Sequence, residues 1–206
     1  DLWGIDTEYS PRTLIWNELT KIPQKTTTAG ENGIDYRERQ LINCVGFQLR
    51  IFVKHTNVNA AVVCRMAVVS PTDKNTIGPT NFFQGYGPSR GKDFAAAPSH
   101  EFTDTPINPD TYTVLWQKKF TLAPCTDGAS SIYGITDRHL PSYHKFTQWV
   151  PLKRQLRYDS EAETSCADAI YLVAWFEGEG SSSTGSDAAA LSIRYKRASI
   201  AYWHNP

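Results

Sequence analysis

The strongest constraint on the fold is an alternation of apolar and polar residues in the first half of the chain. Apolar residues occupy every second position from Phe47 to Val53, and polar residues fill most positions between them, with Phe52 as the exception. Successive side chains of a β-strand point to opposite faces of a sheet. The pattern therefore predicts a strand with one buried face and one wet face, and no segment shows a competing helical period.

Comparable runs recur along the chain at 13–22, 36–43, 60–69, 112–122, 145–158, 169–176 and 191–203. Segment 169–176 is apolar at both parities, which predicts a central strand buried on both faces. Segments 47–53 and 60–69 form either a hairpin or two strands that face one another across a sandwich. About seven or eight strands with long connections predict an all-β fold, a single eight-stranded jelly-roll sandwich, with residues 1–206 as one domain.

The charge balance limits the classes of partner. The chain has 21 Lys and Arg and 21 Asp and Glu, so its net charge is near zero. Nucleic-acid-binding chains are usually basic, which argues against strong non-specific binding but leaves room for a basic face balanced by an acidic one. No apolar run reaches the ~20 residues of a membrane helix, so we expect no membrane partner.

The four cysteines show no zinc-site spacing. Cys44 and Cys64 lie in apolar runs and are expected to be small buried residues. Cys125 and Cys166 lie in expected loops, where they either pair or stay reduced. The pattern favours a reducing compartment over a disulfide framework.

Catalytic motifs are missing from the sequence. There is no G-x-S-x-G, H-E-x-x-H or phosphate-binding loop, and none of the five His lies two or four positions from another. The closely spaced acids, Glu177 with Glu179 and the group Asp159, Glu161 and Glu163, fall in polar loops. We therefore expect no enzyme activity, no catalytic residues, no metal site and no cofactor.

Basic residues recur on the polar sides of the expected strands. The candidates for a phosphate-binding face are Arg37, Arg39, Lys153, Arg157, Arg194 and Lys196. They are either ordinary outward-facing residues or parts of one positively charged surface. Trp149 lies nearby in sequence and is a candidate for stacking on bases or for an interface between subunits.

Residues 70–111 lack a sustained period and are rich in Pro, Gly, Thr and Asn. Long loops of this kind in compact domains are commonly functional. Within this loop the residues Phe82, Phe83, Tyr86 and Arg90 form an aromatic, Gly-rich run. We expect these four residues to contact another copy of the chain.

Several segments, in order, resemble the capsid proteins of small circular single-stranded DNA viruses, and more broadly satellite-virus-like jelly-roll coats. These segments are Ile22-Pro-Gln24 with Tyr36-Arg-Glu-Arg39-Gln-Leu-Ile42, Phe82-Phe-Gln-Gly85 with Arg90-Gly-Lys-Asp-Phe94, Ile107 to Leu115 leading into Lys118-Lys-Phe120, Val150 to Tyr158, Tyr171 to Trp175, and Arg194 to Arg197 with Trp203 to Pro206. The resemblance covers nearly the whole chain, and it depends on all these segments occurring in the same order as in such coats.

The resemblance implies a subunit of a small icosahedral shell of about 60 copies that encloses a single-stranded DNA genome. It implies location in the virion, and in the host nucleus or cytoplasm during assembly. Such coats usually begin with an Arg-rich arm, which we expect upstream of Asp1. The alternative is a carbohydrate-binding or carbohydrate-hydrolysing β-sandwich, supported by the Trp and Tyr content.

Overall fold

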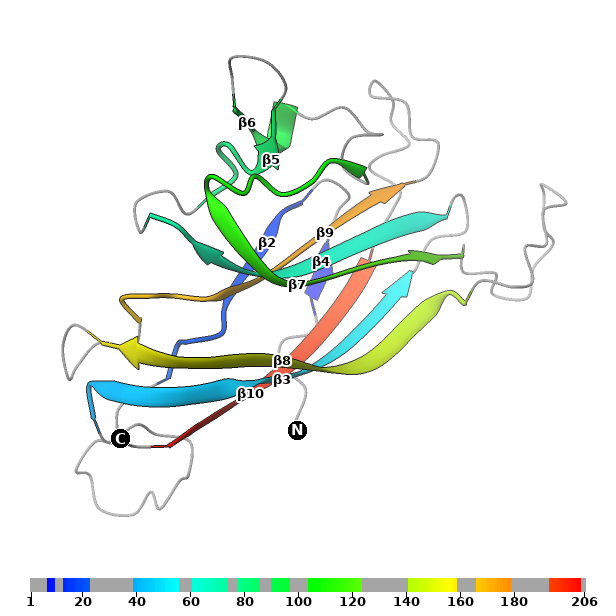
Figure 1. Ribbon diagram of the computed structural model, residues 1–206. Helices are drawn as coiled ribbons and strands as arrows, with labels where there is room; N and C mark the ends of the chain where they lie inside the picture. Colours follow the sequence, from blue (N-terminus) through cyan, green and yellow to red (C-terminus); the bar gives the residue numbers. More distant parts are fainter. Residues whose placement is uncertain are drawn as a thin grey trace, which may run out of the picture.

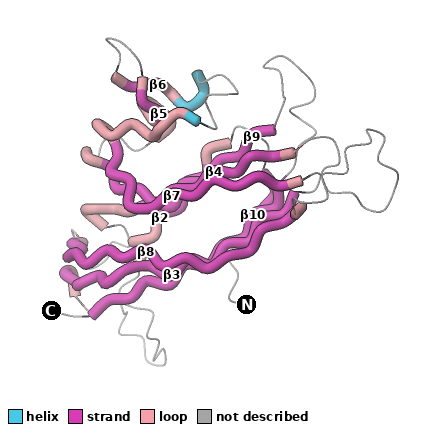
Figure 2. The backbone as a smooth tube through the Cα atoms, turned by 45° about the vertical axis from the view of Figure 1, so that its right-hand side comes forward, coloured by secondary structure: helices cyan, strands magenta, loops and turns pink. Residues whose placement is uncertain are grey.

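The structure is a computed structural model, and it describes residues 7–9, 13–22, 39–55, 61–73, 78–85, 90–96, 104–123, 141–158, 166–178 and 193–204. These residues form two four-stranded antiparallel sheets, stacked face to face as two layers (Figure 2). Sheet I has the order β1 (Thr7–Tyr9), β10 (Ile193–His204), β3 (Leu41–His55) and β8 (Tyr143–Arg157). Sheet II has the order β2 (Ile15–Glu18), β9 (Tyr171–Gly178), β4 (Val62–Pro71) and β7 (Tyr112–Leu122).

The strand pairing is that of a jelly roll. β1 pairs with β10, β2 with β9, β3 with β8 and β4 with β7, as if one long hairpin had been rolled up. Contacts of β10 with β3 and of β9 with β4 then complete the two sheets (Figure 1). This topology confirms the predicted all-β jelly roll. Segments 47–53 and 60–69 lie in opposite sheets, so the second of the two predicted arrangements is the observed one.

The main core fills the space between the sheets. The four apolar positions of the alternating run, Phe47, Leu49, Ile51 and Val53, are fully buried there. β9 lies between β2 and β4, as predicted for a central strand. Its Leu172, Ala174 and Phe176 belong to this core, whereas Val173 and Trp175 point to the opposite face of sheet II.

A second core covers that opposite face. It lies beneath β5 (Phe83–Gln84), β6 (Gly91–Lys92) and a 3-10 turn at Phe94–Ala96, which stand on the far side of sheet II from sheet I (Figure 2). Phe82, Phe83 and Phe94 pack on Trp175, with ring centroids 5.4, 5.9 and 6.4 Å from the indole. The described part of the expected aperiodic loop thus packs on the outer face of sheet II, because its aromatic rings are buried against that sheet.

Cys44 and Cys64 are buried apolar residues, as predicted. Burial raises the pKa of the Cys44 thiol to about 11, and it also raises the pKa of Cys64. Cys166 is a buried free thiol whose Sγ lies 3.3 Å from the Arg157 carbonyl oxygen. Cys125 lies outside the described residues.

Candidate nucleic-acid interface on sheet I

The three long strands of sheet I segregate charge of one sign. β3, β8 and β10 contain no Asp or Glu, although the whole chain is neutral. They carry nine Lys and Arg residues: Arg50, Lys54, Lys145, Lys153, Arg154, Arg157, Arg194, Lys196 and Arg197. The neighbouring edge strand β1 contributes Glu8, which is the register partner of Arg194. These three strands are therefore strongly basic, although the chain as a whole is neutral.

The strand register sets many of these cations on the outer face, away from the core. Cross-strand partners lie on the same face of a sheet. Lys54 pairs with Arg194 on one side and with Tyr143 on the other, and Phe52 pairs with Lys196 and Lys145 in the same way. Because Val53 and Ile51 face the core, these neighbouring rows face outward. We call the outward side of β10, β3 and β8 the basic face.

The basic face holds four of the six predicted phosphate-binding residues, at two separate ends, and a fifth, Arg39, precedes β3 in the chain. Arg194 and Lys196 lie in the rows around Lys54 and Phe52. Lys153, Arg157 and Arg39 lie at the opposite end, and all three are exposed. Lys153 lies within a bulge in the pairing of β3 with β8, between Pro151 and Arg154, and has a positive φ of 50°. Arg37 lies outside the described residues.

Arg50, Lys54 and Lys145 belong to the same face but were not among the predicted residues. Their signal in the sequence is the polar side of an alternating strand, which ordinary surface residues share. Only the pairing of β10, β3 and β8 shows that these positions are neighbours of Arg194 and Lys196.

Two of the nine cations face the other side of sheet I. Arg154 is the register partner of the buried Cys44, and Arg197 is the partner of the buried Ile51. The Arg154 guanidinium lies 3.4 Å from the hydroxyl of Ser70 in sheet II and 3.8 Å from the carboxylate of Asp168, in the turn before β9. These two residues are therefore not part of the basic face.

Two pairs of aromatic rings lie among the outward cations. The rings of Phe52 and Tyr143 are 6.2 Å apart between centroids. Those of Trp149 and Tyr202 are 5.3 Å apart and meet at 73°. Tyr143, Trp149 and Tyr202 are the large aromatic side chains that remain exposed among the described residues. Cations interleaved with exposed aromatic rings are the residue types that bind the backbone and bases of single-stranded nucleic acid.

The predicted subunit-contact residues have different positions. Phe82 and Phe83 are fully buried in the second core, so their side chains cannot contact another copy, and that expectation is corrected. The rings turn inward because Trp175 and Val173 leave an apolar surface on sheet II to cover. Tyr86 lies outside the described residues. Arg90 is exposed, as a contact residue requires.

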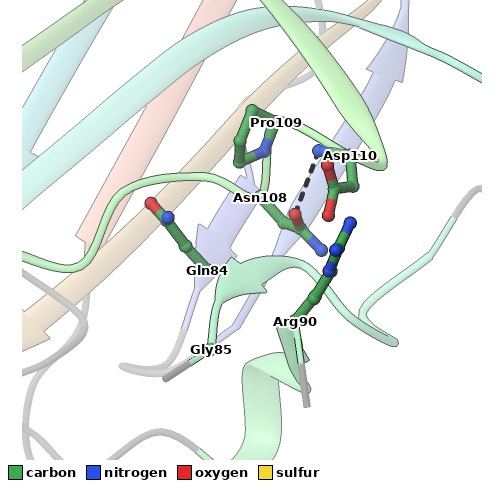
Figure 3. Close-up of a pocket in the computed structure, with 6 residues that line it drawn as sticks. All are labelled: Gln84, Gly85, Arg90, Asn108, Pro109 and Asp110. Atoms are coloured by element: carbon green, nitrogen blue, oxygen red, sulfur yellow. Dashed lines mark hydrogen bonds between the residues drawn. The ribbon is translucent and has the colours of Figure 1, made fainter. Parts of the chain in front are cut away.

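Arg90 borders an open pocket of about 260 Å³ with Gln84, Gly85, Asn108, Pro109 and Asp110 (Figure 3). Asn108 Oδ1 accepts a hydrogen bond from the Asp110 backbone N–H at 3.1 Å, and the Arg90 side chain points toward Asp110. Among the described residues that line this pocket, Asp110 carries the one carboxylate. Glycoside hydrolysis usually needs two facing carboxylates, and these six residues do not supply the second.

Among the described residues, no three His, Cys, Asp or Glu side chains come together as a metal site would require. No helical segment in the described part of the chain has the length and apolar character needed to cross a membrane.

No protein-family model matches this chain, and no curated protein matches its sequence.

Proposed function

We propose that this protein is the coat subunit of a small icosahedral particle that encloses a single-stranded DNA genome. The jelly-roll fold supports the proposal but does not by itself imply it, because the same architecture serves unrelated functions. The resemblance of ordered segments to coats of small circular single-stranded DNA viruses is the reason for proposing single-stranded DNA as the enclosed genome. Copies would associate through their loops about symmetry axes, and the particle would form in the nucleus or cytoplasm of a host cell.

The observation that carries the proposal is the segregation of charge. The three long strands of sheet I carry nine cations and no Asp or Glu, in a chain with no net charge, and seven of the nine lie on the basic face. Part of the outer face of sheet II is covered by β5, β6 and the second core. The outward side of sheet I is basic, whereas the outer face of sheet II carries this second core. In a closed shell the basic face would point inward, where phosphates need counter-charges.

Assembly of the purified full chain tests this proposal. We expect electron microscopy and sedimentation to show uniform closed particles, and nucleic acid extracted from them after nuclease treatment of the outside to be degraded by DNase and not by RNase. Full-length chains that stay monomeric at the same concentrations would overturn the proposal.

A matched pair of variants tests the role of the basic face. Arg50→Ala with Arg194→Ala removes two cations from it, and we expect particles with less enclosed DNA. Lys21→Ala with Lys119→Ala removes two cations outside sheet I, where both side chains are exposed, and should leave the DNA content unchanged. Equal losses in the two double variants would show that total charge, and not the basic face, controls packaging.

A carbohydrate-binding sandwich is the second candidate, and the exposed Trp149 and Tyr202 favour it, since aromatic rings also stack on sugars. Screening the protein against an array of glycans separates the two. A specific glycan signal that Trp149→Ala abolishes would support the second candidate, and a blank array would leave the coat proposal in place.

A further inference from the structure

Trp149 and Tyr202 form an exposed aromatic corner in the basic face. Trp149 is 42% exposed and Tyr202 is 43% exposed. Their ring centroids are 5.3 Å apart and their planes meet at 73°. One ring can therefore present its face to a flat group while the other meets its edge. We call this pair the Trp149–Tyr202 platform.

The absence of a side chain at Gly46 leaves room for the indole of Trp149 against the sheet. Gly46 is buried, and a Cβ atom at this position would lie 2.7 Å from Cζ2 and 3.0 Å from Cη2 of Trp149. The indole thus occupies the space above the backbone of β3 that a side chain at position 46 would fill. Tyr202 is the register partner of Gly46 on the other side. The strand therefore fixes the position of the ring while much of its surface stays open to solvent.

Cations flank the platform along the strands. The Arg50 guanidinium reaches toward Gln48, with Nη2 3.5 Å from Oε1, and Gln48 is the register partner of Trp149. On the other side, Lys153 is exposed four positions after Trp149 in β8. A neutral sugar would form no ion pair with Arg50 or Lys153, whereas the phosphates of a nucleic-acid backbone would neutralise both cations.

We propose that the Trp149–Tyr202 platform binds an unpaired base of single-stranded nucleic acid, while Arg50 and Lys153 contact the phosphates on either side of it. This inference rests on the proposed function and specifies how the basic face holds its cargo. Unpaired bases are free to stack on protein rings, whereas bases in a duplex are already stacked on their neighbours. The site therefore selects single strands over duplexes without reading sequence.

Fluorescence anisotropy with a labelled oligo-dT of about ten nucleotides tests the platform on full-length protein kept unassembled. We expect Trp149→Ala to weaken binding by about ten-fold, and Trp149→Phe to keep most of the affinity because a ring remains. The slope of log affinity against log salt should be unchanged in Trp149→Ala, since no cation is lost. Arg50→Ala should reduce that slope by about one.

Two controls make the result specific. Val114→Ala removes an exposed apolar side chain from sheet II and should bind like the wild type. Weak binding of a duplex of the same length should not change in Trp149→Ala. The inference is overturned if Trp149→Ala keeps full affinity for oligo-dT, if duplex and single strand lose equally, or if the variant alters only the association of subunits. Competition by a neutral oligosaccharide would overturn it as well.

The two proposals fail in different ways. Absence of particles in the electron microscope would reject the coat function even if oligo-dT still bound to the platform. Normal particles with normal DNA content from Trp149→Ala, together with unchanged oligo-dT affinity, would reject the platform alone.

Discussion

The indole of Trp149 lies where a side chain at Gly46 would have to be. A Cβ atom at position 46 would also come within 2.5 Å of the Val150 carbonyl oxygen, so the backbone of β8 closes the same space. Glycine at this position is required for the close approach of β3 and β8, and not for an unusual φ. Substitution must push apart two paired strands next to the bulge between Cys44 and Gly46.

We expect Gly46→Ala to destabilise the fold by about 1–3 kcal/mol, the usual cost of overpacking. Urea unfolding monitored by circular dichroism measures the change. Adding Trp149→Ala relieves the clash with the ring but leaves the clash with the Val150 carbonyl, so the double variant should remain less stable than Trp149→Ala alone. A Gly46→Ala protein as stable as the wild type would show that the close approach of β3 and β8 does not require glycine at this position.

Two histidines, the buried His55 and the half-buried His144, make the stability depend on pH. His55 is fully buried, and its Nδ1 lies 3.1 Å from the Ala123 carbonyl oxygen, so Nδ1 carries the proton and donates. Nε2 is buried without a hydrogen-bond partner among the described residues, and the same is true of His144. Burial lowers the pKa of both rings below the ordinary 6.5, and the nearby Lys118 lowers that of His144 further.

The sign of the effect follows from proton uptake. As the pH falls below about 6.5, the unfolded chain protonates these histidines while the folded chain does not, so the free energy of unfolding decreases. We expect the melting temperature to fall between about pH 7.5 and pH 5.5, and to fall less in the double variant His55→Asn with His144→Gln. Replacing the exposed His204 by Gln is the control and should leave the wild-type dependence intact. An unchanged dependence in the double variant would rule out these two rings as its source.

Local pattern predicted the strands well because burial in a sandwich repeats every two residues. Val53 and Phe47 are buried and Arg50 points outward, as the alternation indicates. The same pattern could not decide between a hairpin and opposed sheets for β3 and β4. That choice depends on pairing between distant segments, such as β3 with β8, which no local period encodes.

The candidate site was partly predictable for the same reason. Arg194 and Lys196 were identified as outward cations, but Arg50 and Lys54 become their neighbours only through the pairing of β10 with β3. Phe82 and Phe83 were misplaced because an aperiodic loop carries no sign of which apolar surface it covers. That surface is provided by Trp175, far along the chain on β9.

Arg65 is a structural cation on the outer face of sheet II. Its guanidinium lies 4.9 Å from the centre of the Trp175 ring, and its Nη1 donates to the Thr105 carbonyl oxygen at 2.8 Å. Arg65→Ala would leave that carbonyl without this donor and expose the indole. We expect a loss of about 1–3 kcal/mol in the free energy of unfolding.

Lys119 provides the matched control, because it is the register partner of Arg65 on β7. Its ion pair with Asp104, 2.7 Å long, lies at the surface, where the two side chains are 48% and 75% exposed. Lys119→Ala should therefore change stability by less than about 1 kcal/mol. Equal effects of the two substitutions in chemical denaturation would mean that Arg65 contributes no more than a surface charge.

Phe82 distinguishes a core role from an interface role. Its ring centroid lies 5.0 Å from that of Phe83, 5.6 Å from that of Tyr112 and 5.7 Å from that of Trp16, and the side chain is fully buried. Phe82→Ala would leave a cavity at the centre of the second core. We expect it to lower the free energy of unfolding of the isolated subunit by about 3–5 kcal/mol.

The measurement is denaturant unfolding of dilute, unassembled protein, so that contacts between copies do not contribute. Tyr143→Ala removes a comparable ring that is 56% exposed on the basic face, and it should shift stability by no more than about 0.5 kcal/mol. If Phe82 instead served contacts between copies, its removal would spare the stability of the subunit and impair only assembly. That combination would reject the second core as the reason why this loop is folded onto sheet II.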